Sequence, residues 1–91
     1  MPVTFHLPAV LARLSDGQRK ITADGATVGD AVSAVSSRFP ALRARLVDDA
    51  GNPYPFITYY LNDEDIRLHG GFDAAVRDGD DVIVIPAVAG G

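Results

Sequence analysis

Cysteine is absent from the 91 residues of this chain. That absence excludes disulfide bridges, thiolate metal sites and any sulfur chemistry carried on the protein's own side chains. Long hydrophobic runs are also lacking, because the most apolar stretch, residues 82–89, is too short to cross a bilayer. The first residues show no positively charged segment followed by an apolar one, so we expect no secretory signal and a cytoplasmic location.

Positive charge is scarce as well. Eight Lys and Arg residues stand against twelve Asp and Glu residues, and the formal net charge is −4. The basic residues are scattered, so a phosphate backbone would be repelled more than attracted, and we expect neither nucleic acid nor a membrane as a partner. Lys20 is the single lysine, which limits any isopeptide linkage to the chain itself.

The residues that are present predict one small globular domain. Hydrophobic residues make up 47% and charged residues 22% of the chain, which is typical of globular proteins. A length of 91 residues allows one domain, and no internal repeat or linker divides it. We expect this domain to span residues 1–86, and residues 87–91 to form a flexible C-terminal tail.

Two strands are expected to open the domain. Residues 3–7 alternate between apolar and polar side chains, a period typical of a half-buried strand. Turn-forming residues at 15–17 lead into a second segment, 18–23, whose one large apolar residue is Ile21. We therefore predict a hairpin whose second strand lies towards an edge of the sheet.

The next segment has the pattern of an amphipathic helix over residues 28–39. Thr27 offers an N-cap hydroxyl, with Asp30 at the capping-box position three residues later. Apolar residues recur at helical spacing and define one buried face: Val28, Ala31, Val32, Val35 and Phe39. Pro40 ends this helix, and residues 41–47 are compatible with one or two further helical turns.

The second half of the chain returns to strands. Turn formers fill residues 48–53 and predict an exposed loop. The strand expected at 57–61 divides its side chains between two faces, Ile57, Tyr59 and Leu61 on one and Thr58, Tyr60 and Asn62 on the other. An acidic turn at 62–65 then leads to a short strand over 66–68, which the glycine pair at 70–71 breaks.

The chain closes with a strongly apolar strand. Residues 72–76 are expected to form a short helical connection, and residues 78–80 a turn. The strand at 81–86 is apolar on both faces, which suits a central position in the sheet. This order of elements describes an α+β roll, in which a mixed sheet packs on one main helix.

The residues after this strand are Ala87, Val88, Ala89, Gly90 and Gly91, all small and uncharged. Five extended residues reach at most about 17 Å, enough to thread a narrow cleft in a partner. Glycine lacks a Cβ, so the last carbonyl would meet an attacking group without steric hindrance. Two terminal glycines arise by chance in roughly 0.5% of chains, so a functional end is the better interpretation.

Four segments carry a family resemblance: Tyr60-Leu61-Asn62-Asp63-Glu64-Asp65-Ile66-Arg67, Gly70-Gly71, Asp78-Gly79-Asp80 and Pro86-Ala87-Val88-Ala89-Gly90-Gly91. They resemble the ubiquitin-like sulfur carriers, a family that includes ThiS, MoaD and the CysO type. The resemblance covers nearly the whole chain, and the first and last segments look most like the CysO type. It implies the ubiquitin-like β-grasp fold, in agreement with the order of elements.

The resemblance implies a two-step activation of the Gly91 carboxylate. An E1-like enzyme would adenylate it with ATP while residues 87–90 thread into that partner, and a sulfur source would then displace AMP to give a thiocarboxylate. In CysO-like systems a PLP-dependent cysteine synthase-like enzyme accepts the sulfur, and a metal-dependent peptidase releases cysteine. The chain itself would be a carrier and not an enzyme, with no cofactor of its own.

Other functions remain open on the same residues. MoaD-like proteins end similarly, so the acceptor of sulfur is also compatible with molybdopterin, with thiazole or with a secondary metabolite. A ubiquitin-like modifier would be conjugated to target lysines through the same adenylate. A plain interaction domain would make no use of the tail.

Candidates outside the tail are few. Tyr60 is predicted to point away from the buried face of its strand, and such aromatics are enriched at interface cores, although a small sheet also uses them for packing. Asp63, Glu64 and Asp65 match the family segment and are candidates for partner docking with Tyr60. Consecutive carboxylates in a turn more often form a solvated face than a metal or acid/base site.

The histidines and the internal glycine pair suggest no further chemistry. His6 and His69 lie far apart in sequence with no third ligand signalled, so we expect no metal site. Gly70-Gly71 lacks the further glycine, lysine and following helix of a phosphate loop, and we interpret it as a backbone turn.

Overall fold

Five strands and three α-helices make up residues 2–86, the part of the chain that the computed structural model describes. In chain order they are β1 (Pro2–His6), α1 (Ala9–Ala12), β2 (Lys20–Asp24), α2 (Val28–Arg38), α3 (Pro40–Leu46), β3 (Ile57–Leu61), β4 (Glu64–Asp65) and β5 (Asp81–Pro86). Three 3₁₀ helices connect them: η1 (Arg13–Ser15), η2 (Ile66–His69) and η3 (Gly71–Asp73).

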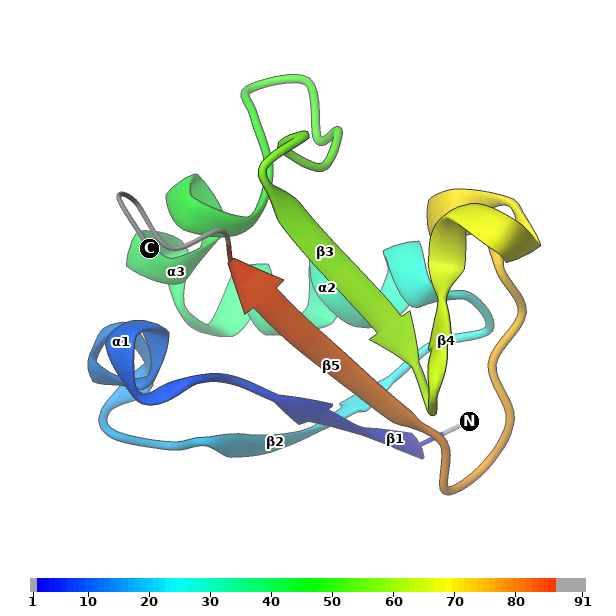
Figure 1. The fold of residues 1–91 in the computed structure, drawn as a ribbon. Coiled ribbons are helices and arrows are strands. Elements are labelled where there is room, and N and C mark those ends of the chain that lie inside the picture. Colours follow the sequence, from blue (N-terminus) through cyan, green and yellow to red (C-terminus); the bar gives the residue numbers. More distant parts are fainter. Residues whose placement is uncertain (1, 87–91) are drawn as a thin grey trace.

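The strands form one mixed sheet in the order β2-β1-β5-β3-β4 (Figure 1). β1 and β5 run parallel, whereas β1–β2, β3–β5 and β3–β4 are antiparallel. The predicted central position of the last strand and edge position of the second strand are both confirmed. Parallel pairing of the first and last strands brings residues near the two ends of the chain together in the middle of the sheet.

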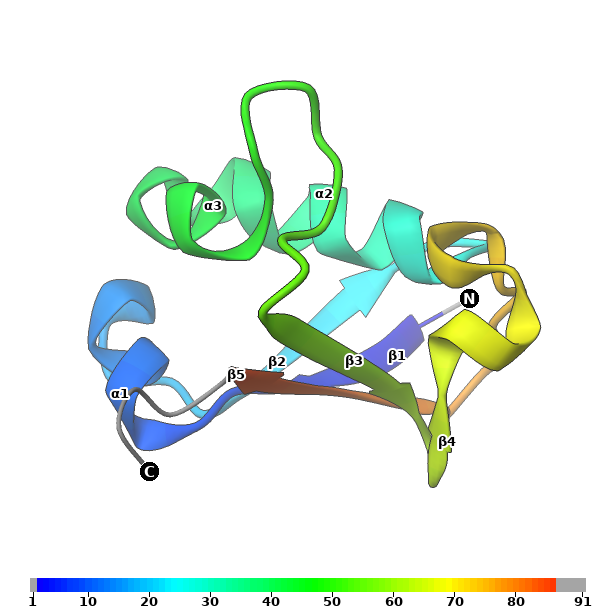
Figure 2. The same cartoon turned by 45° about the horizontal axis from the view of Figure 1, so that its top comes forward.

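The helices α2 and α3 cover one face of this sheet, and Figure 2 shows the two layers. Among residues 2–86, no helix lies along the middle of the opposite face in this view. This is the expected α+β roll, the β-grasp, with α2 as its main helix. Within residues 2–86 no helix is long and apolar enough to span a bilayer.

The start of α2 follows the predicted capping pattern. The hydroxyl of Thr27 accepts a hydrogen bond of 3.1 Å from the backbone N–H of Asp30. The carboxylate of Asp30 accepts from the N–H of Ala26, one residue before the N-cap, so the second half of the capping box is shifted by one position. Pro40 then opens α3, where a missing N–H costs no hydrogen bond.

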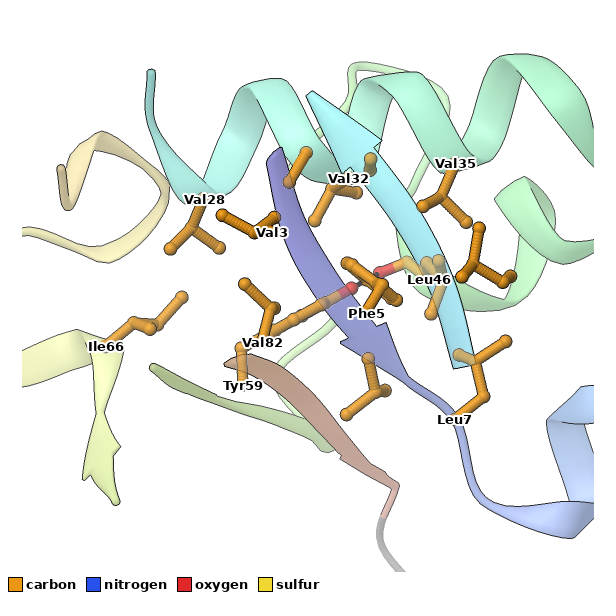
Figure 3. Packing of buried hydrophobic residues seen from close by; sticks show 14 of the residues in the cluster. Val3, Phe5, Leu7, Val28, Val32, Val35, Leu46, Tyr59, Ile66 and Val82 are labelled. Carbon is orange, nitrogen blue, oxygen red and sulfur yellow. Dashed lines mark hydrogen bonds between the residues drawn. The ribbon is translucent and has the colours of Figure 1, made fainter. Parts of the chain in front are cut away.

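The core lies between α2, α3 and the covered face of the sheet (Figure 3). Its largest fully buried side chains come from strands and helices alike: Tyr59, Phe5, Ile21, Leu42, Leu46, Val3, Val28, Val35, Val82 and Val84. The Tyr59 hydroxyl donates a hydrogen bond of 2.8 Å to the carbonyl of Leu46 and so joins β3 to the end of α3. Phe72 meets the Tyr59 ring edge-on at 5.1 Å. This contact ties the 3₁₀ segment after β4 to the same core.

The connection between the first two strands differs from a simple hairpin. β1 and β2 pair as predicted, but α1 and η1 occupy the residues between them. Leu11 and Ala12 bury one side of this short helical segment. The hydroxyl of Ser15 then closes it, because its single proton lies within hydrogen-bond reach of the carbonyls of Ala12 (2.9 Å) and Gln18 (2.8 Å). A four-residue helix carries too little periodic pattern to be recognised from the sequence.

The prediction of a short strand over residues 66–68 is wrong. The fourth strand is Glu64–Asp65, and η2 begins at Ile66. Asp65 causes this change, because its carboxylate accepts a hydrogen bond from the N–H of Arg67 and caps the turn. Alternation fails as well, since Ile66 is buried while Leu68 is 76% exposed. The predicted helical connection at 72–76 is also shorter, because η3 ends at Asp73.

Candidate functional site

The C-terminal segment starts from the centre of the sheet. Pro86, the last residue of β5 and of the described chain, pairs with Ile57 at the start of β3. The predictions for Ala87, Val88, Ala89, Gly90 and Gly91 lie outside the described residues. What the structure defines is the base of that segment, which pairs with β3, whereas the pairing of β5 with β1 ends at Ile83.

One row of side-chain positions crosses the sheet near this base. Across the strands, Lys20 of β2 pairs with His6 of β1, His6 with Ile83 of β5, Ile83 with Tyr60 of β3, and Tyr60 with Asp65 of β4. Paired positions in a sheet lie on the same face. We call these five residues the transverse row. It lies on the face away from α2 and α3, because Phe5, Tyr59, Val82 and Val84, the neighbours of its members, are buried in the core.

The position of Tyr60 agrees with the sequence. Ile57 and Tyr59 are buried on the opposite face of β3, and Tyr60 is half-buried beside Ile83. Its aromatic ring therefore sits on a face without helical cover and next to an apolar neighbour. That environment suits contact with another molecule, and the docking role of Tyr60 stays a prediction.

The acidic residues at 63–65 do not form one solvated turn. Asp63 lies in the turn after β3, while Glu64 and Asp65 form β4 and bond separate partners. Asp65 binds the guanidinium of Arg67 through both carboxylate oxygens, with Nε at 3.1 Å from each. This side-chain hydrogen bonding holds the pKa of Asp65 below its ordinary value. Glu64 instead contacts His69, with Oε2 3.0 Å from Nε2.

The two histidines are separated in the fold and each faces a single carboxylate. His6 Nε2 lies 2.7 Å from Asp81 Oδ1, which fixes the ring at the parallel β1–β5 pair. His69 belongs to η2 at the other side of the sheet. Among residues 2–86, no group of three or more His, Asp or Glu side chains is arranged to hold a metal. The glycine pair Gly70-Gly71 is a backbone turn, as interpreted, with both φ angles positive.

The residues that sequence reasoning missed are apolar and basic. Ile85 is 49% exposed one residue before Pro86, although the last strand reads as apolar on both faces. Phe56, 54% exposed, stacks on Tyr54 just before β3 and so lies near the strand end that pairs with Pro86. Arg19 directly precedes Lys20, the first residue of β2, and β1 separates β2 from β5 in the sheet. One sequence signal could have indicated these exposed residues. A single main helix can cover only one face of a five-stranded sheet, so the other face is left open.

This arrangement favours recognition over chemistry. The transverse row has Lys20 at one end and Asp65, which is paired with Arg67, at the other. Between them lie His6, which is bonded to Asp81, and the apolar and aromatic side chains of Ile83 and Tyr60. The hydroxyl of Ser15, a possible nucleophile by type, is buried with two backbone carbonyls, of Ala12 and Gln18, within hydrogen-bond distance of its single proton. Within the described residues, the site is therefore a surface beside the base of the C-terminal segment.

Known proteins match the chain along its whole length. The profile of the ThiS family matches residues 5–91. The sulfur carrier protein CysO of Mycobacterium tuberculosis is 39% identical over 93 aligned residues, which cover all of both chains. A chain in the crystal structure of the Amycolatopsis orientalis BexX/CysO complex is 43% identical with a TM-score of 0.90, over 98% of this chain and 99% of that one. SAMP1 from Haloferax volcanii is 33% identical with a TM-score of 0.86, over the whole of both chains.

Proposed function

Because this chain belongs to the ThiS family of ubiquitin-like sulfur carriers, we propose that the carboxylate of Gly91 carries sulfur as a thiocarboxylate. The family consists of small carrier proteins. The proposal extends this to the chemistry of the present chain, which acts as a substrate of partner enzymes in the cytoplasm and supplies no catalytic group.

The proposed activation has two steps. An E1-like enzyme transfers the AMP group of ATP to the Gly91 carboxylate, and pyrophosphate leaves. A sulfur nucleophile from the partner's sulfur source then forms a bond to the acyl carbon, and the C–O bond to AMP breaks. A carboxylate is a poor electrophile, and the adenylate gives it a good leaving group. Residues 87–90 are proposed to thread into the enzyme so that Gly91 reaches ATP.

One observation carries the proposal: the family match runs through the final glycine pair of a chain whose described domain is a β-grasp. The sheet supports the same assignment, because β5 ends in pairing with β3 and provides a firm base for the segment that follows. Docking by Tyr60, Asp63, Glu64 and Asp65 is part of this proposal.

Cysteine is the proposed destination of the sulfur. The similarity to CysO sulfur carriers supports this destination. We propose a PLP-dependent cysteine synthase-like enzyme as acceptor, with the thiocarboxylate attacking an activated serine derivative and a metal-dependent peptidase releasing the product. The alternative of a MoaD-like carrier replaces that acceptor with a molybdopterin precursor. Incubating thiocarboxylated carrier with each acceptor enzyme separates them, because only the true acceptor returns the carrier to the carboxylate form or to a cysteine adduct.

The test of the activation step uses the purified chain with the E1-like enzyme of its organism. We expect ATP–pyrophosphate exchange only when the carrier is present, and a shift in intact mass from oxygen to sulfur once sulfide is added. Exchange without the mass shift would refute the sulfur carrier while leaving activation in place. Neither signal with an enzyme that is active on another carrier would refute the whole proposal.

A protein modifier is the second candidate function. Its support is the similarity to SAMP1, a small archaeal modifier protein by name. In this case a target lysine amine captures the adenylate and forms an isopeptide bond. Blotting a cell extract for this protein separates the candidates, because conjugates of higher mass survive reducing agents and a thiocarboxylate carrier leaves none.

A further inference from the structure

A groove lies at the edge of the transverse row nearest the base of the C-terminal segment. It encloses about 440 Å³ between the end of β1, the start of β2 and the last half of β5. Its lining includes His6, Arg19, Lys20, Ile83 and Ile85. Figures 1 and 2 show α1 near the same end of β5, so the groove opens where the sheet meets that short helix.

The charge of this groove is opposite to the charge of the molecule. The chain carries a net charge of −4, yet its single lysine and a neighbouring arginine both line the groove. Neither Arg19 nor Lys20 makes a side-chain hydrogen bond or ion pair within residues 2–86, and both are exposed. His6 is held by Asp81. The two unpaired cations are therefore available to carboxylates from outside.

The floor of the groove is apolar. Ile83 and Ile85 alternate with the buried Val82 and Val84, and Ile85 is 49% exposed. An apolar floor beneath two cations fits a segment that combines an apolar side chain with carboxylates. Ile85 directly precedes Pro86, so whatever fills the groove also stands at the base of residues 87–91.

We propose that this groove docks an acidic, apolar segment of the activating enzyme and thereby aligns the C-terminal segment with the enzyme's ATP site. The proposal rests on the function proposed above and names the surface and the partner chemistry it uses. The charge pair steers the encounter, and the isoleucines hold the complex once water is displaced. The groove stands at the base of residues 87–91, which the proposed activation threads into the enzyme, so the enzyme is the partner placed beside it. Two copies of the chain, each with a net charge of −4, repel each other overall, which disfavours a second copy.

The test compares three charge reversals in the full chain. Arg19→Glu and Lys20→Glu change the groove, and Arg77→Glu makes the same charge change in the turn before β5, at the opposite end of that strand. We expect the Kd for the E1-like enzyme of the same organism to rise about tenfold for each groove variant. Arg77→Glu should stay within about twofold of the wild type. Lys20→Arg keeps the positive charge and should bind with the Kd of the wild type. Added salt should weaken enzyme binding by the wild type more than enzyme binding by Lys20→Glu.

Several outcomes would overturn the proposal. Equal Kd values for Lys20→Glu, Arg19→Glu and Arg77→Glu would remove the groove from the interface. If deleting residues 87–91 shifts the NMR signals of Lys20 and Ile83 in the free protein, the chain's own C-terminal segment fills the groove. If the protein forms a dimer that dissociates in Lys20→Glu, the groove binds a second copy of the chain. The carrier function is tested separately by measuring thiocarboxylate formation at saturating enzyme. If the carrier function holds, Lys20→Glu still forms the thiocarboxylate, whatever its Kd.

Discussion

Tyr60 of β3 pairs with Ile83 of β5 on the sheet face turned away from α2 and α3. The two side chains come from segments 23 positions apart in the sequence, and parallel pairing of β1 with β5 adds His6 on the other side of Ile83. An aromatic and an aliphatic residue thus share a half-open face a few residues before the C-terminal segment begins. This relationship makes Tyr60 a docking candidate that can be tested apart from folding.

Replacing Tyr60 by alanine should weaken the complex with the activating enzyme. We expect Kd to rise about tenfold, because buried interface tyrosines commonly contribute more than about 1 kcal/mol. The control is Leu68→Ala, which removes an exposed apolar residue from η2, outside the transverse row. Calorimetric titration of both variants measures the difference. Equal affinities for the two would leave Tyr60 without a docking role.

The hydroxyl of Tyr59 should matter for stability and not for activation. In Tyr59→Phe the buried carbonyl of Leu46 loses its donor, and the free energy of unfolding should fall by about 1–2 kcal/mol. Tyr60→Phe removes the same hydroxyl from a half-buried position and should change it by less than about 0.5 kcal/mol. Urea unfolding followed by circular dichroism measures both. A neutral Tyr59→Phe would contradict the role assigned to this bond.

Alkaline pH should destabilise the fold through the same side chain. Burial raises the pKa of Tyr59 above its ordinary value of about 10. The unfolded chain therefore releases this proton first, so the stability is complete below about pH 10 and declines as the pH rises further. Unfolding free energies measured on either side of that pH should fall more steeply in the wild type than in Tyr59→Phe. Parallel curves would show that other groups cause the decline.

Deleting Gly91 should separate docking from chemistry. The shortened chain keeps the whole described domain, so we expect an almost unchanged melting temperature and no ATP–pyrophosphate exchange. It should still compete with the full chain for the activating enzyme, because Tyr60 and the groove remain. Exchange assays with increasing amounts of the deletion variant measure this inhibition. A large loss of thermal stability would show that the last residue packs against the domain.

Strong periodicity explains which elements the sequence predicted. The alternation at β1 and β3, the helical spacing of α2 and the apolar run of β5 each bury one face, and these elements were confirmed. Where the pattern is short, a local hydrogen bond decides the structure. Asp65 turned the expected strand at 66–68 into η2, and Ser15 closed an unpredicted helical turn.

The proposed docking surface was harder to predict for a different reason. Tyr60 and the acidic residues were visible in one segment, but Lys20, His6 and Ile83 meet them only through the strand order. The apolar residues of β5 correctly indicated a central strand, but the helices cover only one of its two apolar faces. A single sequence states which faces are apolar and leaves open which of them another layer covers.

The most direct measurement is tandem mass spectrometry of the C-terminal peptide after reaction with the activating enzyme, ATP and sulfide. We expect one oxygen to be replaced by sulfur, with the changed fragment ions confined to those that contain Gly91. The same reaction without ATP should give the unmodified peptide. An unmodified Gly91, despite an enzyme that performs carrier-dependent ATP–pyrophosphate exchange, would contradict the assignment of this chain's C-terminus as the site that carries sulfur.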